Sequence, residues 1–322
     1  IELIRRVGVQ FTFGVRIQQE ITLNDLDEQY DAVFLAIGTW KENWVYLPGT
    51  ELKGVMPALP FLEAVSKREP TGLGKKVVVI GGGNAAIDSA RTAMRMGSDV
   101  TIVYRRERKD MPAIHEEVEA AEAEGAKIVF LASPHRIVGD ESGRVKALEA
   151  VKTRLGEYDA SGRRRPIPTD EIVRIPCDTV ILAVGEAVDI DFAKASGLKI
   201  KENGLIEVDR YTLATSRPKF YAGGDLITGA SNVSNAMGYG KKAARNIDRM
   251  LTGEERWASL WPEFDYDMTV PAHPSASRRH RVREPDPLER VRDFREATYG
   301  LTTVEAMEEA CRCLRCDIRN GD

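Results

Sequence analysis

The sequence lacks any long hydrophobic run: no stretch approaches the about 20 consecutive apolar residues that a membrane-spanning helix needs. It also has no leader in which basic, apolar and small residues follow one another, so the protein is expected in the cytoplasm and not in a membrane. Neither sign of charge is in large excess, because 46 Lys and Arg residues face 50 Asp and Glu residues. Duplex binding normally needs a broad basic face, so this balance argues against a nucleic-acid partner.

Cysteine is also scarce, with four residues in a chain of 322. Three of them are crowded together as Cys311, Cys313 and Cys316, which does not resemble a disulfide framework. Spacing this tight points to metal or redox chemistry. The fourth, Cys177, stands in an apolar run and is expected to be a small core residue.

What is present suits a folded protein of about two domains. The hydrophobic fraction of 43% is enough to build cores. A glycine-rich turn at 81–83 follows an apolar strand expected at 77–80 and precedes a helix expected at 85–96. A second strand is expected at 100–104, and this succession is the βαβ unit of a doubly wound sheet.

The turn carries the dinucleotide-binding pattern G-x-G-x-x-A. Its glycines permit a tight turn and the close approach of a pyrophosphate, and the helix N-terminus offers free N–H groups and a positive dipole. A glycine-rich turn without a ligand is the alternative. The pattern predicts cofactor contacts at Gly81, Gly83, Asn84, Ala85 and Ala86.

The residues at the end of the second strand bear on which nicotinamide cofactor is preferred. An NAD enzyme usually has an acidic residue there for the ribose 2′-hydroxyl. This chain has Arg105 and Arg106, whose guanidinium groups can clamp a 2′-phosphate, so NADP(H) is predicted over NAD(H). Two alternatives stay open: the arginines are solvated surface residues, or nearby Glu107 favours NAD.

Two apolar runs, at 31–38 and 177–185, end in the same Ala-X-Gly pattern and predict related buried strands that finish at Gly38 and Gly185. The sequence therefore predicts an α/β fold with two nested doubly wound, Rossmann-like domains, the first incomplete, and an extended and helical C-terminal tail. The expected domains are a first, partial domain at 1–70 and 201–252, a nicotinamide domain at 71–200, and a tail at 253–322. A strand is also expected at 9–13, and a helix at 302–316.

Several motifs together point to one family. They are Tyr-Asp-Ala-Val-Phe-Leu-Ala-Ile-Gly-Thr at 30–39, Ala-Leu-Pro-Phe-Leu at 58–62, Gly-Gly-Gly-Asn-Ala-Ala-Ile-Asp at 81–88, Tyr-Arg-Arg at 104–106 with Met111-Pro112, Gly-Arg-Arg-Arg at 162–165, and Phe-Tyr-Ala-Gly-Gly-Asp at 220–225. Through them the chain resembles, from Arg5 to Leu251, the small (beta) subunit of NADPH-dependent glutamate synthase and related FAD- and NAD(P)-dependent pyridine nucleotide oxidoreductases.

The resemblance implies that FAD binds in one domain and NADP(H) in the other. Gly224 and Asp225 match the family's second flavin motif, and backbone N–H groups near Asn232 and Val233 would meet the flavin ring. The family's first flavin motif, a G-x-G-x-x-G, is absent from residues 1–70. The FAD site is therefore expected to be incomplete in this chain, either because the chain is truncated at its N-terminus or because another polypeptide completes the domain.

The tail resembles the start of the iron–sulfur module that is often fused to this family. Cys313 and Cys316 match the Arg-Cys-Leu-X-Cys motif that supplies the first ligands of a 4Fe–4S cluster. Such a cluster normally needs four thiolates, so it would form only with ligands from elsewhere. Zinc is a weaker alternative with the same shortage.

The resemblance thus implies an oxidoreductase subunit that passes hydride from NADPH to FAD. Electrons would continue to iron–sulfur centres, a redox partner subunit or a ferredoxin-like acceptor. No catalytic side chain is nominated, since the cofactors carry this chemistry. A non-catalytic dinucleotide-binding docking subunit is the first alternative. A thioredoxin-reductase-like disulfide reductase is the second, although residues 75–200 contain no CxxC pair.

Overall fold

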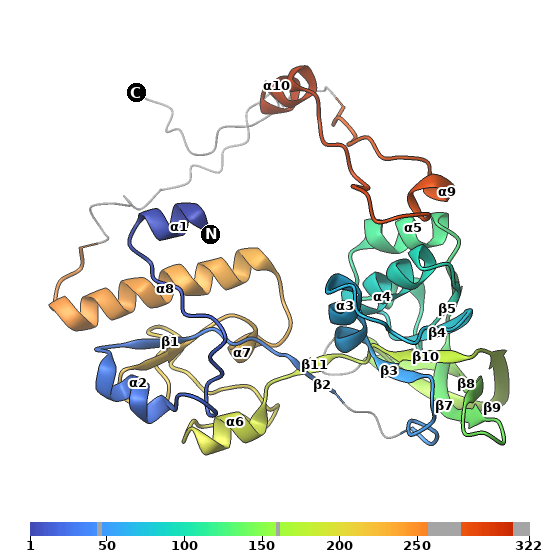
Figure 1. Cartoon of the computed structure of the whole chain (residues 1–322), viewed down its shortest axis with the longest axis horizontal. Helices are drawn as coiled ribbons and strands as arrows, with labels where there is room; N and C mark the ends of the chain where they lie inside the picture. Colours follow the sequence, from blue (N-terminus) through green and yellow to red (C-terminus); the bar gives the residue numbers. More distant parts are fainter. Residues whose placement is uncertain (44–46, 159–161, 257–277, 312–322) are drawn as a thin grey trace. The chain divides into compact units, whose positions relative to one another are not determined.

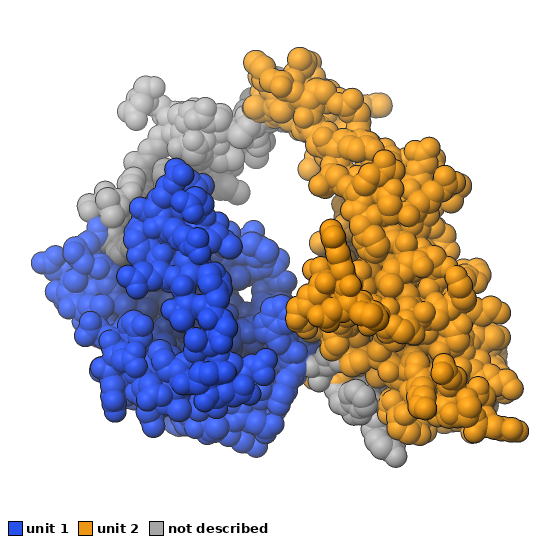
Figure 2. Space-filling view, in the orientation of Figure 1, with its two compact units in different colours: residues 1–41, 186–263 blue, residues 42–185, 264–322 orange. Residues whose placement is uncertain are grey.

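The computed structural model describes residues 1–43, 47–158, 162–256 and 278–311. The chain forms two compact units, which Figure 2 colours separately. Unit 1 contains residues 1–41 and 186–263, and unit 2 contains residues 42–185 and 264–322. Each unit is therefore assembled from two separate stretches of the chain.

Unit 2 is built on a five-stranded sheet with the strand order β3-β10-β4-β5-β6. Every neighbouring pair in it is parallel. Its strands are β3 (Val55–Pro57), β4 (Lys76–Ile80), β5 (Asp99–Val103), β6 (Lys127–Val129) and β10 (Thr179–Leu182). Such a sheet is covered on both faces, which explains why β4 and β10 read as unbroken apolar runs.

The two faces of this sheet pack against different layers. Val77, Val79 and Ile102 point into a core shared with the helices α3 (Ala58–Ser66), α4 (Asn84–Arg95) and α5 (His115–Ala123). The alternate residues Val78 and Ile80 pack on the other side, with Ile137 and Leu148. This alternation follows from the period of two in a β-strand.

The second layer is an antiparallel sheet of β7 (Ala132–Gly139), β8 (Val145–Tyr158) and β9 (Arg164–Pro176), in the order β7-β8-β9. Figure 1 shows it on the side of the parallel sheet opposite α3, α4 and α5. The edge strand β6 leads directly into it, because only two residues separate the end of β6 from the start of β7. The segment that follows β5 is therefore next to this antiparallel sheet, as the hydrogen bond from the Ala132 N–H to the Tyr104 carbonyl shows.

Unit 1 has a parallel pair of strands, β1 (Val33–Leu35) and β12 (Phe220–Ala222). Around them lie α1 (Glu2–Arg6), α2 (Leu23–Gln29), α6 (Ile190–Ala195), α7 (Asp225–Thr228) and α8 (Val233–Thr252). Their core contains Leu35, Phe220 and Leu226. Helix α8 is 20 residues long, yet its one buried residue is Ala243.

Three expected elements differ from the structure. Residues 9–13 form no strand, and Phe13 is 68% exposed. The predicted helix at 302–316 is α10 (Thr303–Cys311) within the described residues. Residues 42–70 are expected in the same domain as 201–252 but lie in unit 2, because β3 pairs with β10 and α3 packs into the same core as α4.

The remaining elements are short. Strands β2 (Lys41–Glu42) and β11 (Glu186–Ala187) form a two-stranded sheet. A 3-10 helix, η1 (Arg108–Asp110), follows β5, and α9 (Pro287–Arg290) lies in the tail. No helix in the described ranges combines the length and the apolar character that crossing a bilayer demands.

Candidate dinucleotide-binding site

The turn at 81–83 joins β4 to α4 and is packed so tightly that two of its positions exclude a side chain. A Cβ on Gly81 would lie 2.1 Å from the carbonyl oxygen of Ala183, and the backbone φ of +147° is one that side chains rarely adopt. A Cβ on Gly82 would lie 2.5 Å from the ring of Tyr104. The glycines are therefore required by packing before any ligand is considered.

Gly83 is different, because a Cβ there would meet no atom within 4 Å. It is the N-cap of α4, and no side chain caps this end of the helix. The first turn, from Asn84 to Ala86, thus offers backbone N–H groups at an open position. A helix end of this kind, after a parallel strand and a glycine turn, fits the pyrophosphate of a dinucleotide.

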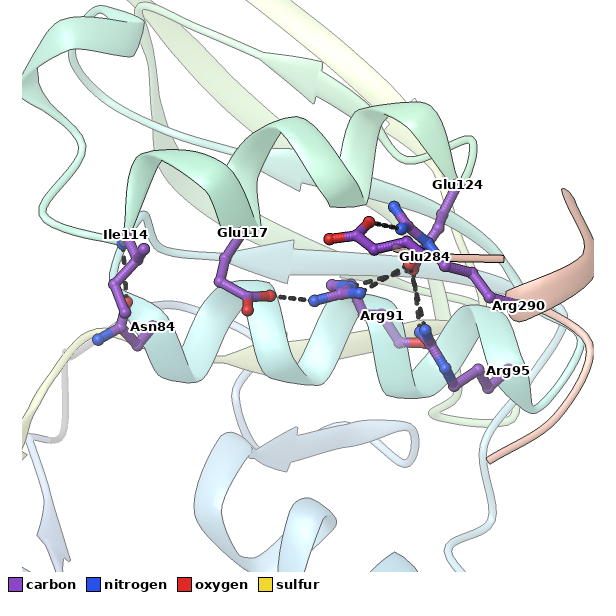
Figure 3. A network of polar contacts seen from close by, with 8 residues as sticks. All are labelled: Asn84, Arg91, Arg95, Ile114, Glu117, Glu124, Glu284 and Arg290. Carbon is purple, nitrogen blue, oxygen red and sulfur yellow. Dashed lines mark hydrogen bonds and ion pairs between the residues drawn. The ribbon is translucent and has the colours of Figure 1, made fainter. Parts of the chain in front are cut away.

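Of the first residues of α4, two pack into the core and one forms a hydrogen bond to another segment. Ala86 is fully buried against the sheet, and Ala85 packs at the edge of the same core. The Oδ1 atom of Asn84 accepts a hydrogen bond from the backbone N–H of Ile114 at 2.9 Å, as Figure 3 shows. Asn84 therefore ties the start of α4 to the residue before α5.

The two arginines expected to clamp a 2′-phosphate lie at the same edge of the sheet as the glycine turn. Ile80 pairs with Val103, and the Gly81 N–H donates to the Val103 carbonyl at 3.1 Å. Arg105 is exposed, whereas Arg106 is 4% exposed and its Nε donates to the Arg164 carbonyl at 2.7 Å. Of the two, Arg105 is the exposed residue.

Glu107, the acid that kept NAD open as an alternative, has a local partner. Its carboxylate lies 2.7 Å from the Lys109 ammonium, and this contact lowers the pKa of Glu107 below its usual value. It also caps the short helix η1 through a capping box with Asp110. A carboxylate engaged in this way has less capacity to accept from a ribose hydroxyl.

Helix α4 is fixed at its other end by a buried carboxylate. The side chain of Glu124 is 0% exposed and contacts three arginines (Figure 3). Arg91 donates from Nη2 at 2.7 Å, Arg95 donates from Nη1 at 2.9 Å, and the Nε of Arg290, in α9, lies 2.7 Å away. Burial alone would raise the pKa of Glu124, but the hydrogen bonds and positive charges of Arg91 and Arg95 lower it.

In unit 1, the residues matching the second flavin motif surround the end of β12. A Cβ on Gly223 would lie 2.8 Å from the Phe34 ring. Gly224, with a φ of +64°, leads into α7, whose first residue Asp225 accepts from the Ser231 hydroxyl at 2.9 Å. Asn232 caps α8 by accepting the Asn235 N–H at 2.9 Å.

The other predicted site residues lie at or just after the ends of strands, or at the start of a helix. Val233 opens α8 and is 75% exposed. Gly38 follows β1 with a φ of +67°, and Gly185, in unit 2, follows β10 with a φ of +111°. These three positions were deduced from glycine-terminated strands and from the resemblance, and the structure places each at a strand end or a helix start.

Sequence reasoning missed a second carboxylate in unit 1. Burial raises the pKa of Glu186, and the negative charge of Asp225 raises it further. Glu186 therefore shares its surroundings with the aspartate of the flavin motif. Its position directly after Gly185 was the available signal. The buried Glu124 was also missed, because it belongs to no recognised motif, and Tyr104 was noted only as part of the Tyr-Arg-Arg motif and not for its packing under Gly82.

The cysteine predictions are only partly described. Cys313 and Cys316 lie outside the described residues. Cys311 is exposed at the end of α10, and Cys177 is 4% exposed, where burial raises its thiol pKa to about 12. This agrees with a core role for Cys177. Among the residues that the structure describes, no group of three metal-binding side chains is assembled.

Comparison with protein families and curated proteins gives a consistent result. The model of a family described as pyridine nucleotide-disulphide oxidoreductase matches residues 5–240. Subunit beta of the NADP(+)-dependent formate dehydrogenase of Moorella thermoacetica is 38% identical over 330 residues, which cover 98% of this chain and 46% of that protein. Subunit beta of the NADPH-Fe(3+) oxidoreductase of Geobacter sulfurreducens is 36% identical, covering 98% of this chain and 52% of that protein. The chain thus spans about half the length of these relatives.

The small chain of the NADPH glutamate synthase of Escherichia coli is 36% identical over 271 residues, covering 78% of this chain and 57% of that protein. Among solved structures, Mycobacterium tuberculosis FprA in complex with NADPH superposes with a TM-score of 0.60 at 20% identity, over 75% of this chain and 69% of that chain. T. acidophilum thioredoxin reductase superposes with a TM-score of 0.52 at 25% identity, over 69% and 66%. The predicted α/β fold class and the predicted family resemblance are confirmed.

Proposed function

Because the chain belongs to the pyridine nucleotide-disulphide oxidoreductase family, we propose that it forms part of an NADPH-dependent flavin oxidoreductase. In this proposal unit 2 binds NADP(H) and unit 1 contributes to an FAD site. Bound together, the two cofactors supply hydride transfer, and the protein supplies binding, orientation and electrostatics. A cytoplasmic location is proposed from the sequence.

The open helix start after the glycine turn carries the proposal. Packing requires glycine at positions 81 and 82, whereas a Cβ added to Gly83 would meet no atom within 4 Å. A ligand that needs backbone contact at this position explains that choice. In the proposal the first amides of α4 bind the pyrophosphate, and Arg105 binds the 2′-phosphate.

Several features of unit 1 support a flavin contribution that another segment completes. Gly224 and Asp225 precede α8, and Asn232 fixes the start of that helix. Amides at such a start would favour the negative charge that gathers on a reduced flavin. Ala243 alone is buried on the 20-residue α8, so most of that helix is available for packing. An upstream segment or another polypeptide would supply the missing glycine motif.

We further propose that electrons leave through iron–sulfur centres, a partner subunit or a ferredoxin-like acceptor. Two relatives that match 98% of this chain, the tail included, are named as beta subunits. Cys313 and Cys316 would contribute to a 4Fe–4S cluster only together with ligands from elsewhere. The final acceptor belongs to the whole protein, of which this chain represents about half the length in those relatives.

A non-catalytic docking subunit that binds a dinucleotide is the second candidate. A disulfide reductase is disfavoured, because Cys177, the cysteine of the nicotinamide region, is single and buried. One absorbance measurement distinguishes the flavin oxidoreductase from the docking subunit. Oxidised FAD is added under anaerobic conditions to the purified chain assembled with the segment that completes its flavin site, NADPH follows, and the flavin absorbance is recorded.

An oxidoreductase bleaches the flavin bands at a rate well above that of free FAD with NADPH. A docking subunit binds NADPH but leaves the bands unchanged. NADH serves as the matched donor, since the proposal expects slower bleaching with it. If the folded chain bound no nicotinamide dinucleotide at all, both candidates would be wrong.

A further inference from the structure

Three consecutive backbone carbonyls at the end of β5 accept hydrogen bonds from outside the parallel sheet. The Tyr104 carbonyl accepts the Ala132 N–H at 3.1 Å, and the Arg106 carbonyl accepts the Leu131 N–H at 3.2 Å. Between them, the Arg105 carbonyl accepts the hydroxyl of Thr153 at 2.9 Å. The segment that carries Arg105 is thus held by β7 and β8, which belong to the antiparallel layer.

Thr153 is the one side chain among these three donors. It is 6% exposed, so its hydroxyl is removed from water and depends on this bond. Its own N–H donates to the Leu131 carbonyl at 2.7 Å. Both hydrogen-bond donors of Thr153 are therefore used here: its hydroxyl binds the segment after β5, and its backbone N–H binds the loop between β6 and β7.

The β8–β9 ladder is irregular at this point. Val151 pairs with Ile172, but Thr153 pairs with Pro168, so the register shifts between the two. Extra residues in one strand re-aim side chains, and such bulges are common beside functional sites. The irregularity thus lies beside Thr153, whose hydroxyl reaches from the 14-residue strand β8 to a neighbouring layer.

The same layer also immobilises the residue after Arg105. Arg106 is 4% exposed and its Nε donates to the Arg164 carbonyl at 2.7 Å, in β9. With Arg106 buried and the Arg105 carbonyl fixed, the Arg105 side chain starts from a backbone with little freedom. Pre-organisation of this kind raises affinity by lowering the ordering cost of binding.

We infer that Thr153 is a positioning residue for nicotinamide cofactor specificity: its hydroxyl holds the Arg105 backbone so that the guanidinium is preset for a 2′-phosphate. The inference rests on the proposed function, in which Arg105 binds that phosphate. Thr153 itself touches no cofactor. It acts through Arg105, and its removal should affect NADPH and not NADH.

The test replaces Thr153 by valine, which keeps the β-branched shape and loses the hydroxyl, and by serine, which keeps the hydroxyl. Dissociation constants for NADPH and NADH are measured by calorimetry on the full chain. Thr153→Val should weaken NADPH by roughly threefold to tenfold, the loss that one buried hydrogen bond normally causes. NADH should change less than twofold, and Thr153→Ser should keep the wild-type ratio. Thr153→Ala removes the hydroxyl without strain if the valine variant does not fold.

Measuring Arg105→Ala in parallel distinguishes a failure of the positioning role of Thr153 from a failure of the proposed function. If Arg105→Ala abolishes the NADPH preference and the hydroxyl-free Thr153 variants retain it, the positioning role is wrong and the proposed function survives. If Thr153→Val weakens both dinucleotides equally, the residue is only structural. If Arg105→Ala leaves the preference unchanged, the phosphate contact itself is wrong.

Discussion

At the scale of single residues, the glycine turn separates packing from ligand binding. Gly82 faces the Tyr104 ring, and Gly83 faces open space. Gly83 also has an ordinary φ of −89°, which any residue can adopt. An added methyl group should therefore lower stability at Gly82, and at Gly83 it should weaken dinucleotide binding and leave stability unchanged.

Gly82→Ala should lower the free energy of unfolding by about 1–3 kcal/mol, because the new methyl overlaps Tyr104 and forces it to move. Gly83→Ala should leave stability within about 0.5 kcal/mol, as at an unstrained site, and weaken dinucleotide binding. Urea denaturation and calorimetry measure the two properties. A Gly83→Ala variant that binds NADPH like the wild type would mean that no pyrophosphate approaches this backbone.

Residue identity could be predicted from the sequence where a motif specifies it. The glycine pattern at 81–86 and the arginine pair after β5 were found because their spacing has a physical meaning. The different fates of Arg105 and Arg106 were not predictable, because they depend on the Arg164 carbonyl, which lies 58 positions along the chain. The role of Thr153 was hidden for the same reason.

At the scale of elements, α4 is held at both ends. Asn84 ties its start to Ile114, and Arg91 and Arg95 tie its last turns to Glu124. The tail joins this cluster through Arg290 of α9, which also forms an ion pair with Glu284 (Figure 3). The buried carboxylate thus connects α4, α5 and the tail.

Glu124 should make stability depend on pH. Its folded-state pKa is lowered, so its contribution is present above its usual value of 4.5 and is lost as the pH falls toward the folded value. Glu124→Gln should cost about 3 kcal/mol at pH 7, because arginines then lose their buried partner. The difference from wild type should shrink below pH 4.5. Urea denaturation across this range measures it.

Glu117→Gln is the matched control, since Glu117 contacts Arg91 but its side chain is 43% exposed. It should change stability little at any pH. A Glu124→Gln variant that is as stable as the wild type at pH 7 would contradict the clustering of α4, α5 and the tail around this carboxylate.

Elements were predictable where local pattern and partners agree. The succession β4-α4-β5 was foreseen within a residue or two at each end because its apolar runs and glycine turn act locally. Residues 9–13 alternate like a strand, yet they find no neighbouring strand to satisfy their backbone groups.

At the scale of the whole molecule, each unit is made of two stretches of chain. The sequence predicts two stretches for the flavin domain but a single one, 71–200, for the nicotinamide domain. Nesting was therefore predictable from the sequence, but the boundaries were not. They depend on β3, a strand of three residues that joins the sheet of unit 2 by pairing with β10. No local signal in so short a strand identifies its partner.

The central claim is that unit 2 binds NADP(H) in preference to NAD(H) through Arg105, at the edge where β4 and β5 end. Calorimetry of the full chain and of Arg105→Ala with both dinucleotides tests it most directly. We expect tighter binding of NADPH by the wild type, with a loss of roughly tenfold to a hundredfold for NADPH in the variant, as is usual when a hydrogen bond to a charged group is removed. NADH should change less than threefold. Equal losses for the two dinucleotides, or no binding of either by folded protein, would contradict it.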